Sequence, residues 1–305
     1  MSFALEQNFK KASKFIDFGD NESAKQIYLD ILEKYPMNVK ASQCLNELNK
    51  SSFKSKTNIR DIIINDIYRL YKNKNFEDAL KKAFEIYTNN ESNASLNHLI
   101  GLIQLDLGNS YNSISYFKKA VESEPKKLSF NFNLALSLKK SNKFEESLIY
   151  FKKVLELDIN QPHANFNLAE IYENLNQIDK AIFHYQKSLN NDKKLVEAYR
   201  NLALIFEQIN QKDDAREVYE VAIKNNPENF SIRNNFGRFL NSEKNYKQAV
   251  IHLTKAFKIN PNSSKLNFNL ALSYKGIKNF EKAVEHYNKT LKLKPKYYQA
   301  YNHLS

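Results

Sequence analysis

A 34-residue internal repeat is the feature that most constrains how this chain can fold. The hexapeptide NFNLAL at 131–136 returns as NFNLAE at 165–170 and again as NFNLAL at 267–272, always at a multiple of 34 residues. Prolines and small residues follow the same spacing: Pro227, Pro261 and Pro295; Ser113, Ser147, Ala181, Ala215, Ala249 and Ala283. Agreement in this many columns at a period of about 20–50 residues predicts stacked structural repeats.

Each copy carries two apolar stripes at helical spacing. In the copy that begins at Leu128, a polar turn at 140–143 separates the two stripes, which are Leu134, Ala135 and Leu138, then Phe144, Ser147, Leu148, Phe151, Val154 and Leu155. These positions fit amphipathic helices, and 5 Gly and 6 Pro in 305 residues are too few for the turns of an all-β fold. One helix pair cannot bury its apolar face alone, so neighbouring copies must stack. The sequence predicts an all-α protein, an α-α solenoid, although NFNLAL alternates locally like a strand.

The repeat resembles the tetratricopeptide repeat, which places large, small and aromatic residues at fixed positions of a 34-residue unit. The copy at 264–297 supplies that pattern with Leu270, Ala271, Tyr274, Phe280, Ala283, Tyr287, Thr290 and Pro295. Lys212 and Ser110 depart from it, and the family's tryptophan is absent. The resemblance implies helix-turn-helix copies stacked into a right-handed superhelix whose first helices line a concave groove.

The repeat frame divides the chain into four parts. Residues 1–50 hold an isolated first copy followed by one extra helix, and 51–59 form a polar linker. Seven continuous copies fill 60–297, and 298–305 begin a further repeat that stops inside its first helix. Because a repeat array normally ends in a polar capping helix, we expect a longer protein of which this chain is the N-terminal portion.

Composition narrows the classes of partner. The net charge of +12 comes mainly from lysines spread along the chain, and we interpret it as a solvated surface rather than a nucleic-acid site. The lone Cys44 fits a reducing compartment. No stretch reads as a signal peptide or a membrane span, so a cytoplasmic protein without membrane association is expected.

No catalytic constellation is evident in the sequence. His184, His252 and His286 recur one copy apart, and that separation is too long for one shared metal ion. Gly-rich phosphate loops are also missing from the sequence. We therefore predict no enzyme activity, no metal and no cofactor for this region.

Asparagine recurs at the sixth position of the first helix in five copies: Asn133, Asn167, Asn201, Asn235 and Asn269. Each costs about 0.6 kcal/mol relative to alanine inside a helix, so the column needs a compensating role. An amide side chain carries donors and an acceptor that match the peptide backbone. This column, here called the Asn ladder, resembles the groove asparagines of the array in O-linked N-acetylglucosamine transferase, which implies that it holds an extended peptide.

Neighbouring positions of the same helices add aromatic and basic side chains: Phe132, Phe166, Phe268, Arg200 and Arg238. Two interpretations stay open for these residues and for the Asn ladder. We favour groove contact for the amides, with bonding to an adjacent repeat as the alternative. For the aromatic residues, packing against adjacent helices is slightly favoured over contact with a partner.

The functional prediction is a non-enzymatic scaffold for a protein or peptide partner. As an alternative, the chain is the substrate-recruiting N-terminal region of a larger sulfo-, methyl- or glycosyltransferase, because it resembles the arrays of bacterial fusions of this kind. A third possibility is self-association through the open C-terminal end. A clamp for chaperone tails is disfavoured, since no three successive copies supply the Lys, Asn and Arg that it needs.

Overall fold

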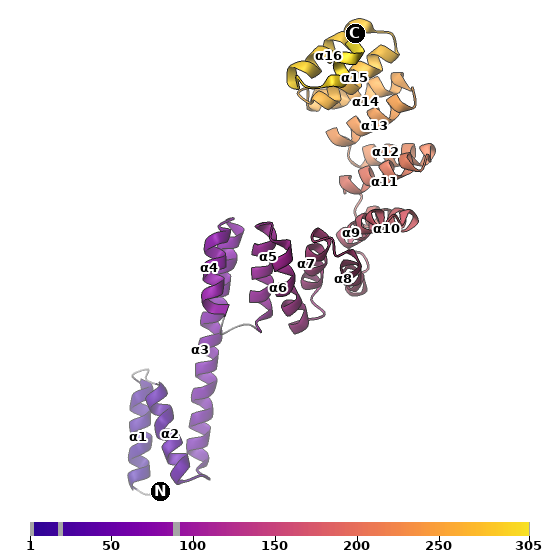
Figure 1. Cartoon of the computed structure of the whole chain (residues 1–305). Coiled ribbons are helices and arrows are strands. Elements are labelled where there is room, and N and C mark those ends of the chain that lie inside the picture. The colour runs from indigo at the N-terminus through magenta and orange to yellow at the C-terminus, as the bar shows by residue number, and fades with distance from the viewer. Residues whose placement is uncertain (1–2, 18–20, 88–91, 305) are drawn as a thin grey trace. The chain divides into compact units, whose positions relative to one another are not determined.

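The computed structural model describes residues 3–17, 21–87 and 92–304. Throughout these three segments the chain consists of α-helices joined by short turns, without a strand (Figure 1). This confirms the all-α prediction and places NFNLAL inside a helix. The chain divides into two compact units, Met1–Ser123 and Glu124–Ser305, and each is described by itself.

The described residues of the N-terminal unit include two hydrophobic clusters that share one helix. Its helices are α1 (Phe3–Asp17), α2 (Asn21–Lys34), α3 (Val39–Lys72), α4 (Phe76–Tyr87), α5 (Ala94–Asp106) and α6 (Ser110–Ser123). One cluster forms around Ala12 and Tyr28, and the other around Ala83 and Ile100. The helix α3 belongs to both, because α1 and α2 lie at its N-terminal end and α4 lies at its C-terminal end (Figure 1).

The structure corrects the predicted polar linker at 51–59. These residues lie within α3, which runs without a break from Val39 to Lys72. The stretch contains neither proline nor glycine, and serine and asparagine only weaken a helix without ending it. The residues that begin and end α3 lie outside this stretch. The side chain of Asn38 caps the start by accepting a 3.0 Å hydrogen bond from the Ala41 amide, and Lys74 follows the end with a positive φ.

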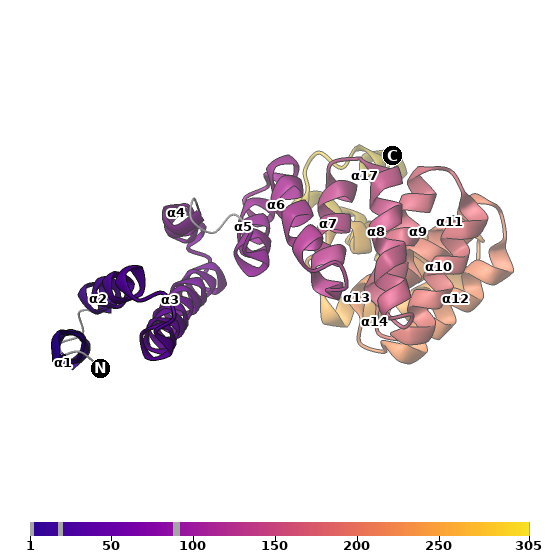
Figure 2. The same cartoon turned by 90° about the horizontal axis from the view of Figure 1, so that it is seen from below.

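The C-terminal unit is a regular stack of helix pairs. It comprises α7 (Leu128–Lys140), α8 (Phe144–Leu157), α9 (Pro162–Asn174), α10 (Ile178–Asn191), α11 (Val196–Gln208), α12 (Lys212–Asn225), α13 (Phe230–Ser242), α14 (Tyr246–Ile259), α15 (Ser264–Gly276), α16 (Phe280–Leu293) and α17 (Tyr298–Leu304). Each pair packs on the next in chain order (Figure 2). One continuous hydrophobic cluster runs through the stack from Ala135 to Ala300, as expected of a solenoid.

Small residues set the close approach of the two helices within a copy. Ala135 and Ser147 are fully buried where α7 meets α8, and the Ser147 hydroxyl donates a 2.7 Å hydrogen bond to the Ala135 carbonyl. The same position in α13 is Gly237, where an added Cβ would lie 2.3 Å from the Leu253 side chain. The column of small residues found in the sequence therefore marks the places where backbones and bulky side chains meet.

In the seven copies from residue 60 onward, the turn between the two helices uses a left-handed residue at position 15 of the repeat. Its N–H bonds back three residues and the next N–H bonds back five, as in Asn142 to Lys139 (3.0 Å) and Lys143 to Leu138 (2.9 Å). This pattern is the Schellman motif. The left-handed residues are Lys74, Gly108, Asn142, Asn176, Asn210, Lys244 and Lys278. Each first helix thus ends at the same position of the repeat.

A polar side chain at position 4 of the first helix ties that helix to the loop before it. The Asn131 amide donates to the Pro125 carbonyl (2.8 Å), and Asn267 donates to the Pro261 carbonyl (3.0 Å). In α13 the guanidinium of Arg233 makes the equivalent bond to the Pro227 carbonyl at 2.8 Å. The first asparagine of NFNLAL therefore has a structural role, because it satisfies a loop carbonyl that no helix bond reaches.

Candidate functional site

The five residues of the Asn ladder lie at equivalent points of α7, α9, α11, α13 and α15 but differ in their environment. Asn167 and Asn269 are 7% and 9% exposed, so most of each side chain is buried. Asn133, Asn201 and Asn235 are half-buried. The face that carries them is therefore not a uniform row of free amides, because the five side chains differ in how far they are buried.

Asn167 is held by charged neighbours on two helices. The Lys139 ammonium on α7 donates a 2.7 Å hydrogen bond to its carbonyl oxygen and also forms an ion pair with Glu170 on α9. The Asn167 amide in turn donates to the His163 carbonyl at 2.7 Å. With its carbonyl oxygen and its amide both engaged, this side chain links α7 to α9.

Asn201 and its neighbour Arg200 form a second internal link. The Asn201 amide donates to the buried Tyr185 hydroxyl at 3.0 Å, and that hydroxyl donates to Glu173 at 2.9 Å. Burial, together with the nearby carboxylates, raises the pKa of Tyr185, so it stays a neutral donor. Arg200 is exposed, and its Nε and Nη2 both lie 3.2 Å from the Asn201 oxygen.

Arg238 is also engaged inside the protein. Its guanidinium donates to both carboxylate oxygens of Glu207 on α11, at 2.7 and 2.8 Å. The Tyr219 hydroxyl donates to the same carboxylate at 2.8 Å, and burial raises the pKa of this tyrosine. The predicted basic site residue thus joins α11 to α13, and Glu207 balances its charge.

The three predicted phenylalanines pack on the aromatic residue at position 24 of their own copy. Ring centroids lie 5.5 Å apart for Phe132 and Phe151, and 5.8 Å apart for Phe166 and Tyr185. Phe268 lies 5.9 Å from Tyr287 in the same way. Each phenylalanine is half-buried, so one side of the ring supports the core while part of it still faces outward.

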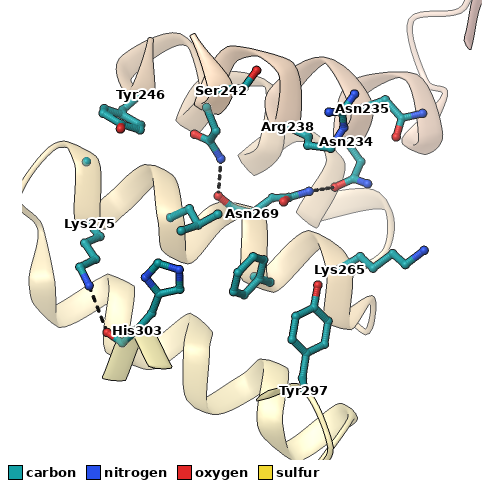
Figure 3. Close-up of a pocket in the computed structure, with 14 residues that line it drawn as sticks. Asn234, Asn235, Arg238, Ser242, Tyr246, Lys265, Asn269, Lys275, Tyr297 and His303 are labelled. Atoms are coloured by element: carbon teal, nitrogen blue, oxygen red, sulfur yellow. Dashed lines mark hydrogen bonds between the residues drawn. The ribbon is translucent and has the colours of Figure 1, made fainter. Parts of the chain in front are cut away.

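The structure brings several predicted residues together around one pocket, of about 810 Å³, between α13 and α15 (Figure 3). Its volume lies within the range of roughly 300–1,000 Å³ typical of ligand sites. The lining residues are Asn234, Asn235, Arg238, Asn241, Ser242, Tyr246, Lys265, Phe268, Asn269, Leu272, Lys275, Gly276, Tyr297 and His303. Together these residues form the C-terminal pocket.

Hydrogen bonds order one wall of the C-terminal pocket. The Asn269 amide donates to the Asn234 oxygen at 3.1 Å, and the Asn241 amide donates to the Asn269 carbonyl at 2.8 Å (Figure 3). The Ser273 hydroxyl donates to the Asn241 oxygen at 2.7 Å. The side chain of Asn235 lies on the same wall and makes no hydrogen bond to any other residue of the described segments. Its amide keeps donors and an acceptor for a bound molecule.

Apolar groups form the floor of the C-terminal pocket. The Phe268 and Tyr297 rings lie 5.0 Å apart between centroids, and Leu272 follows Phe268 one helical turn later on α15. Lys265 lies at one end of this floor and Lys275 at the other (Figure 3). The Lys275 ammonium donates to the His303 carbonyl at 3.2 Å, which joins α15 to α17.

Several residues of this pocket were missed in the sequence. Asn234, Asn241, Lys275 and Tyr297 occupy positions whose residue type varies from copy to copy, so the comparison of copies did not single them out. A usable signal was the clustering of amides within one copy, since Asn234 and Asn235 are adjacent and Asn241 lies two turns later. Helical spacing places residues seven positions apart, such as Asn234 and Asn241, on one face.

The histidines at position 23 serve packing. His184 and Asn165 lie 3.0 Å apart, and His286 and Asn267 lie 2.9 Å apart, both through Nδ1. Burial lowers the pKa of His184 and of His252 to about 4. In the described part of the chain, no group of three His, Cys, Asp or Glu residues could hold a metal ion. Likewise, none of its helices is both long and apolar enough to span a bilayer.

Sequence models of the tetratricopeptide repeat match this chain over more than half of its length. The matched residues are 94–127, 128–160, 150–183, 200–264 and 264–297. No curated protein sequence matches this chain.

Solved structures show the same fold. The C-terminal part of a TPR repeat-containing protein from Cytophaga hutchinsonii matches with a TM-score of 0.65 and 13% identity, over 79% of this chain and 99% of its own. PilF of Pseudomonas aeruginosa matches with a TM-score of 0.57 and 17% identity, over 70% of this chain and 98% of its own. YrrB, described as a TPR protein with an unusual peptide-binding site, matches with a TM-score of 0.51 and 22% identity, over 61% of this chain and 96% of its own. The chain belongs to the tetratricopeptide repeat family, whose arrays serve as scaffolds for protein–protein interaction.

Proposed function

We propose that the C-terminal unit is a cytoplasmic, non-catalytic scaffold that binds an extended peptide segment along its first helices. The C-terminal pocket anchors this segment. The observation that carries the proposal is the free amide of Asn235 above the apolar floor of Phe268 and Leu272. A lone Cys44 without a disulfide fits the reducing environment of the cytoplasm.

The Asn ladder divides into two roles under this proposal. Asn167 and Asn201 are occupied by Lys139 and Tyr185, and they fix the spacing of the first helices. Asn235 contacts the peptide backbone directly. Fixed spacing matters because a groove that is already ordered loses less entropy on binding.

The peptide backbone matches the groups that the pocket offers. A peptide bond presents one N–H and one C=O, and an asparagine side chain can serve both at once. Each hydrogen bond contributes only about 0.5–1.5 kcal/mol net, and the ordering of an extended segment opposes binding. We therefore expect dissociation constants on the order of micromolar.

A matched pair of alanine variants tests the proposal. Peptides are selected from a phage-displayed library of random linear dodecapeptides and then measured by fluorescence polarisation. Asn235→Ala should weaken the selected peptides about five- to ten-fold, because one donor and one acceptor are lost. Asn288→Ala makes the same change at an exposed position of α16 outside the pocket and should leave the affinity unchanged.

Both substitutions favour the helix, since alanine is the better helix former. Loss of binding in Asn235→Ala therefore cannot be ascribed to unfolding when circular dichroism is unchanged. Equal affinities of the two variants for every selected peptide would reject the role of the pocket.

A further inference from the structure

The C-terminal pocket has cationic side chains in its lining and no carboxylate. Three of its residues are basic, namely Arg238, Lys265 and Lys275. Glu207 pairs with Arg238 from outside the lining, so that charge is balanced. Neither Lys265 nor Lys275 forms an ion pair with a carboxylate of the described residues, and both are exposed. The two lysines are therefore the uncompensated charges of the site.

These two lysines lie at opposite ends of α15. They are ten positions apart in the sequence, which corresponds to about 15 Å along the helix at 1.5 Å per residue. An extended peptide rises about 3.3 Å per residue, so it covers this distance in about four to five residues. Phe268 and Leu272, the apolar floor, lie between the two lysines along α15 and line the same pocket.

The imidazole of His303 does not compete with the lysines for an anion. Burial and the adjacent Lys275 both lower the pKa of His303, so this group is neutral near pH 7. Its ring lies 5.8 Å from the Phe268 ring and extends the apolar floor. The pocket thus offers one apolar centre flanked by two separated positive charges.

We propose that the C-terminal pocket recognises an acidic segment in which two carboxylate side chains, four to five residues apart, flank one apolar side chain. The carboxylates approach Lys265 and Lys275, the apolar side chain lies on Phe268 and Leu272, and Asn235 bonds the backbone between them. This inference rests on the proposed function, because it specifies the chemistry of the peptide that the scaffold binds.

The wide spacing of the two lysines favours an acidic peptide over a single-stranded nucleic acid. A groove for single-stranded nucleic acid tracks a phosphate at every nucleotide with a continuous row of cations and stacks the bases on aromatic rings. Here two isolated lysines stand at the ends of an apolar floor, and Phe268 and Tyr297 already contact each other at 5.0 Å. Amide side chains on the wall match peptide groups instead.

Fluorescein-labelled dodecapeptides in a Gly/Ser background test this inference. The acidic probe carries two Glu five residues apart with one Leu midway, and the neutral probe replaces both Glu by Gln. A third probe has the two Glu only two residues apart. The acidic probe should bind most tightly, and raising the salt from about 0.05 to about 0.5 M should weaken it selectively, because salt screens exposed charges.

Two double variants with the same net charge give the decisive comparison. Each exposed ion pair accounts for about a two- to three-fold change in affinity. Lys265→Gln with Lys275→Gln should therefore weaken the acidic probe about five-fold at low salt and leave the neutral probe unchanged. Lys258→Gln with Lys292→Gln removes two exposed lysines of α14 and α16 outside the pocket and should change neither.

Five outcomes would overturn the inference. Equal binding of the acidic and neutral probes, or equal losses in both double variants, would leave the scaffold proposal standing while rejecting charge recognition, provided that Asn235→Ala still weakens binding. Tighter binding of an eight-nucleotide single strand would make nucleic acid the occupant. Concentration-dependent dimerisation in light scattering, abolished by the pocket variant alone, would make a second copy of the chain the occupant. Failure of every peptide, selected or designed, to bind would reject both proposals.

Discussion

At the scale of the single residue, the turn inside each copy has an unusual composition. Among the described residues, seven adopt a left-handed backbone conformation at position 15, and Gly108 is the one glycine of these seven. The others are asparagine or lysine with φ between 55 and 63°. Residues with a Cβ are disfavoured there by about 1–2 kcal/mol, whereas glycine adopts this conformation readily. The turns therefore hold strain that a substitution can release.

Lys244→Gly should raise the free energy of unfolding of the C-terminal unit by about 0.5–1 kcal/mol. The gain is the relief of left-handed strain, reduced by the larger entropy that glycine loses on folding. Urea denaturation measures it as an increase in the midpoint. Lys255→Gly, in the interior of α14, serves as the control and should lower the midpoint, because glycine costs about 1 kcal/mol within a helix. A lower midpoint for both variants would contradict the strain at position 15.

At the scale of the helix, histidines that are partly or fully buried pack the second helix of a copy on its first. His184 on α10 bonds Asn165 on α9, and its ring stacks on Tyr172. Burial chiefly, and then Lys152, lower the pKa of His184 to about 4, and His252 and His286 are shifted in the same direction. A histidine with a lowered pKa binds fewer protons in the folded state than in the unfolded state, so stability falls as the pH decreases.

The C-terminal unit should therefore lose stability as the pH falls from about 6.5 toward about 4, the interval between the unfolded and folded pKa values. Its stability should be nearly constant from about pH 7 to 8. Urea denaturation at about pH 7.5 and about pH 5 measures the effect. Replacing His184, His252 and His286 together by glutamine should reduce the difference between the two pH values. The same difference in the parent chain and in the triple variant would assign the pH dependence to other groups.

The sequence predicted the helices far better than the environment of the amides. The 34-residue period placed the helices of the C-terminal unit because apolar spacing depends on local geometry alone. The free or occupied state of an amide depends instead on contacts of about 3 Å across copies. Lys139 of the previous copy donates a hydrogen bond to Asn167, and no residue near Asn167 in the sequence predicts this contact. The linker at 51–59 was expected from polar composition, yet polar residues without Pro or Gly continue α3.

At the scale of the whole molecule, the described residues of each unit have hydrophobic clusters of their own. One cluster extends from Ala135 to Ala300 in the C-terminal unit, and two others in the N-terminal unit share α3. In a repeat array each copy is stabilised by its own contacts and by those with its neighbours. A loss of packing in one cluster should therefore remain local to the unit that contains it.

Phe239→Ala should open the C-terminal unit while the N-terminal unit stays protected. The ring is 2% exposed within the C-terminal cluster, and its loss should cost about 3–5 kcal/mol. Hydrogen exchange read by mass spectrometry should show faster exchange in α11, α13 and α15, with α5 and α6 unchanged. Faster exchange throughout α5 and α6 as well would show that the chain unfolds as one cooperative body.

The left-handed turns also offer sites at which the stability of this protein can be changed in steps. Five of them lie in the C-terminal unit at 34-residue steps, each occupied by asparagine or lysine. Substitutions at sites that far apart usually add in their effects. None of the five lines the C-terminal pocket. Introducing glycine at one, two or more of these turns would give a series of proteins that differ stepwise in their free energy of unfolding. Because their binding surface is the same, the effect of stability on affinity can be measured by itself.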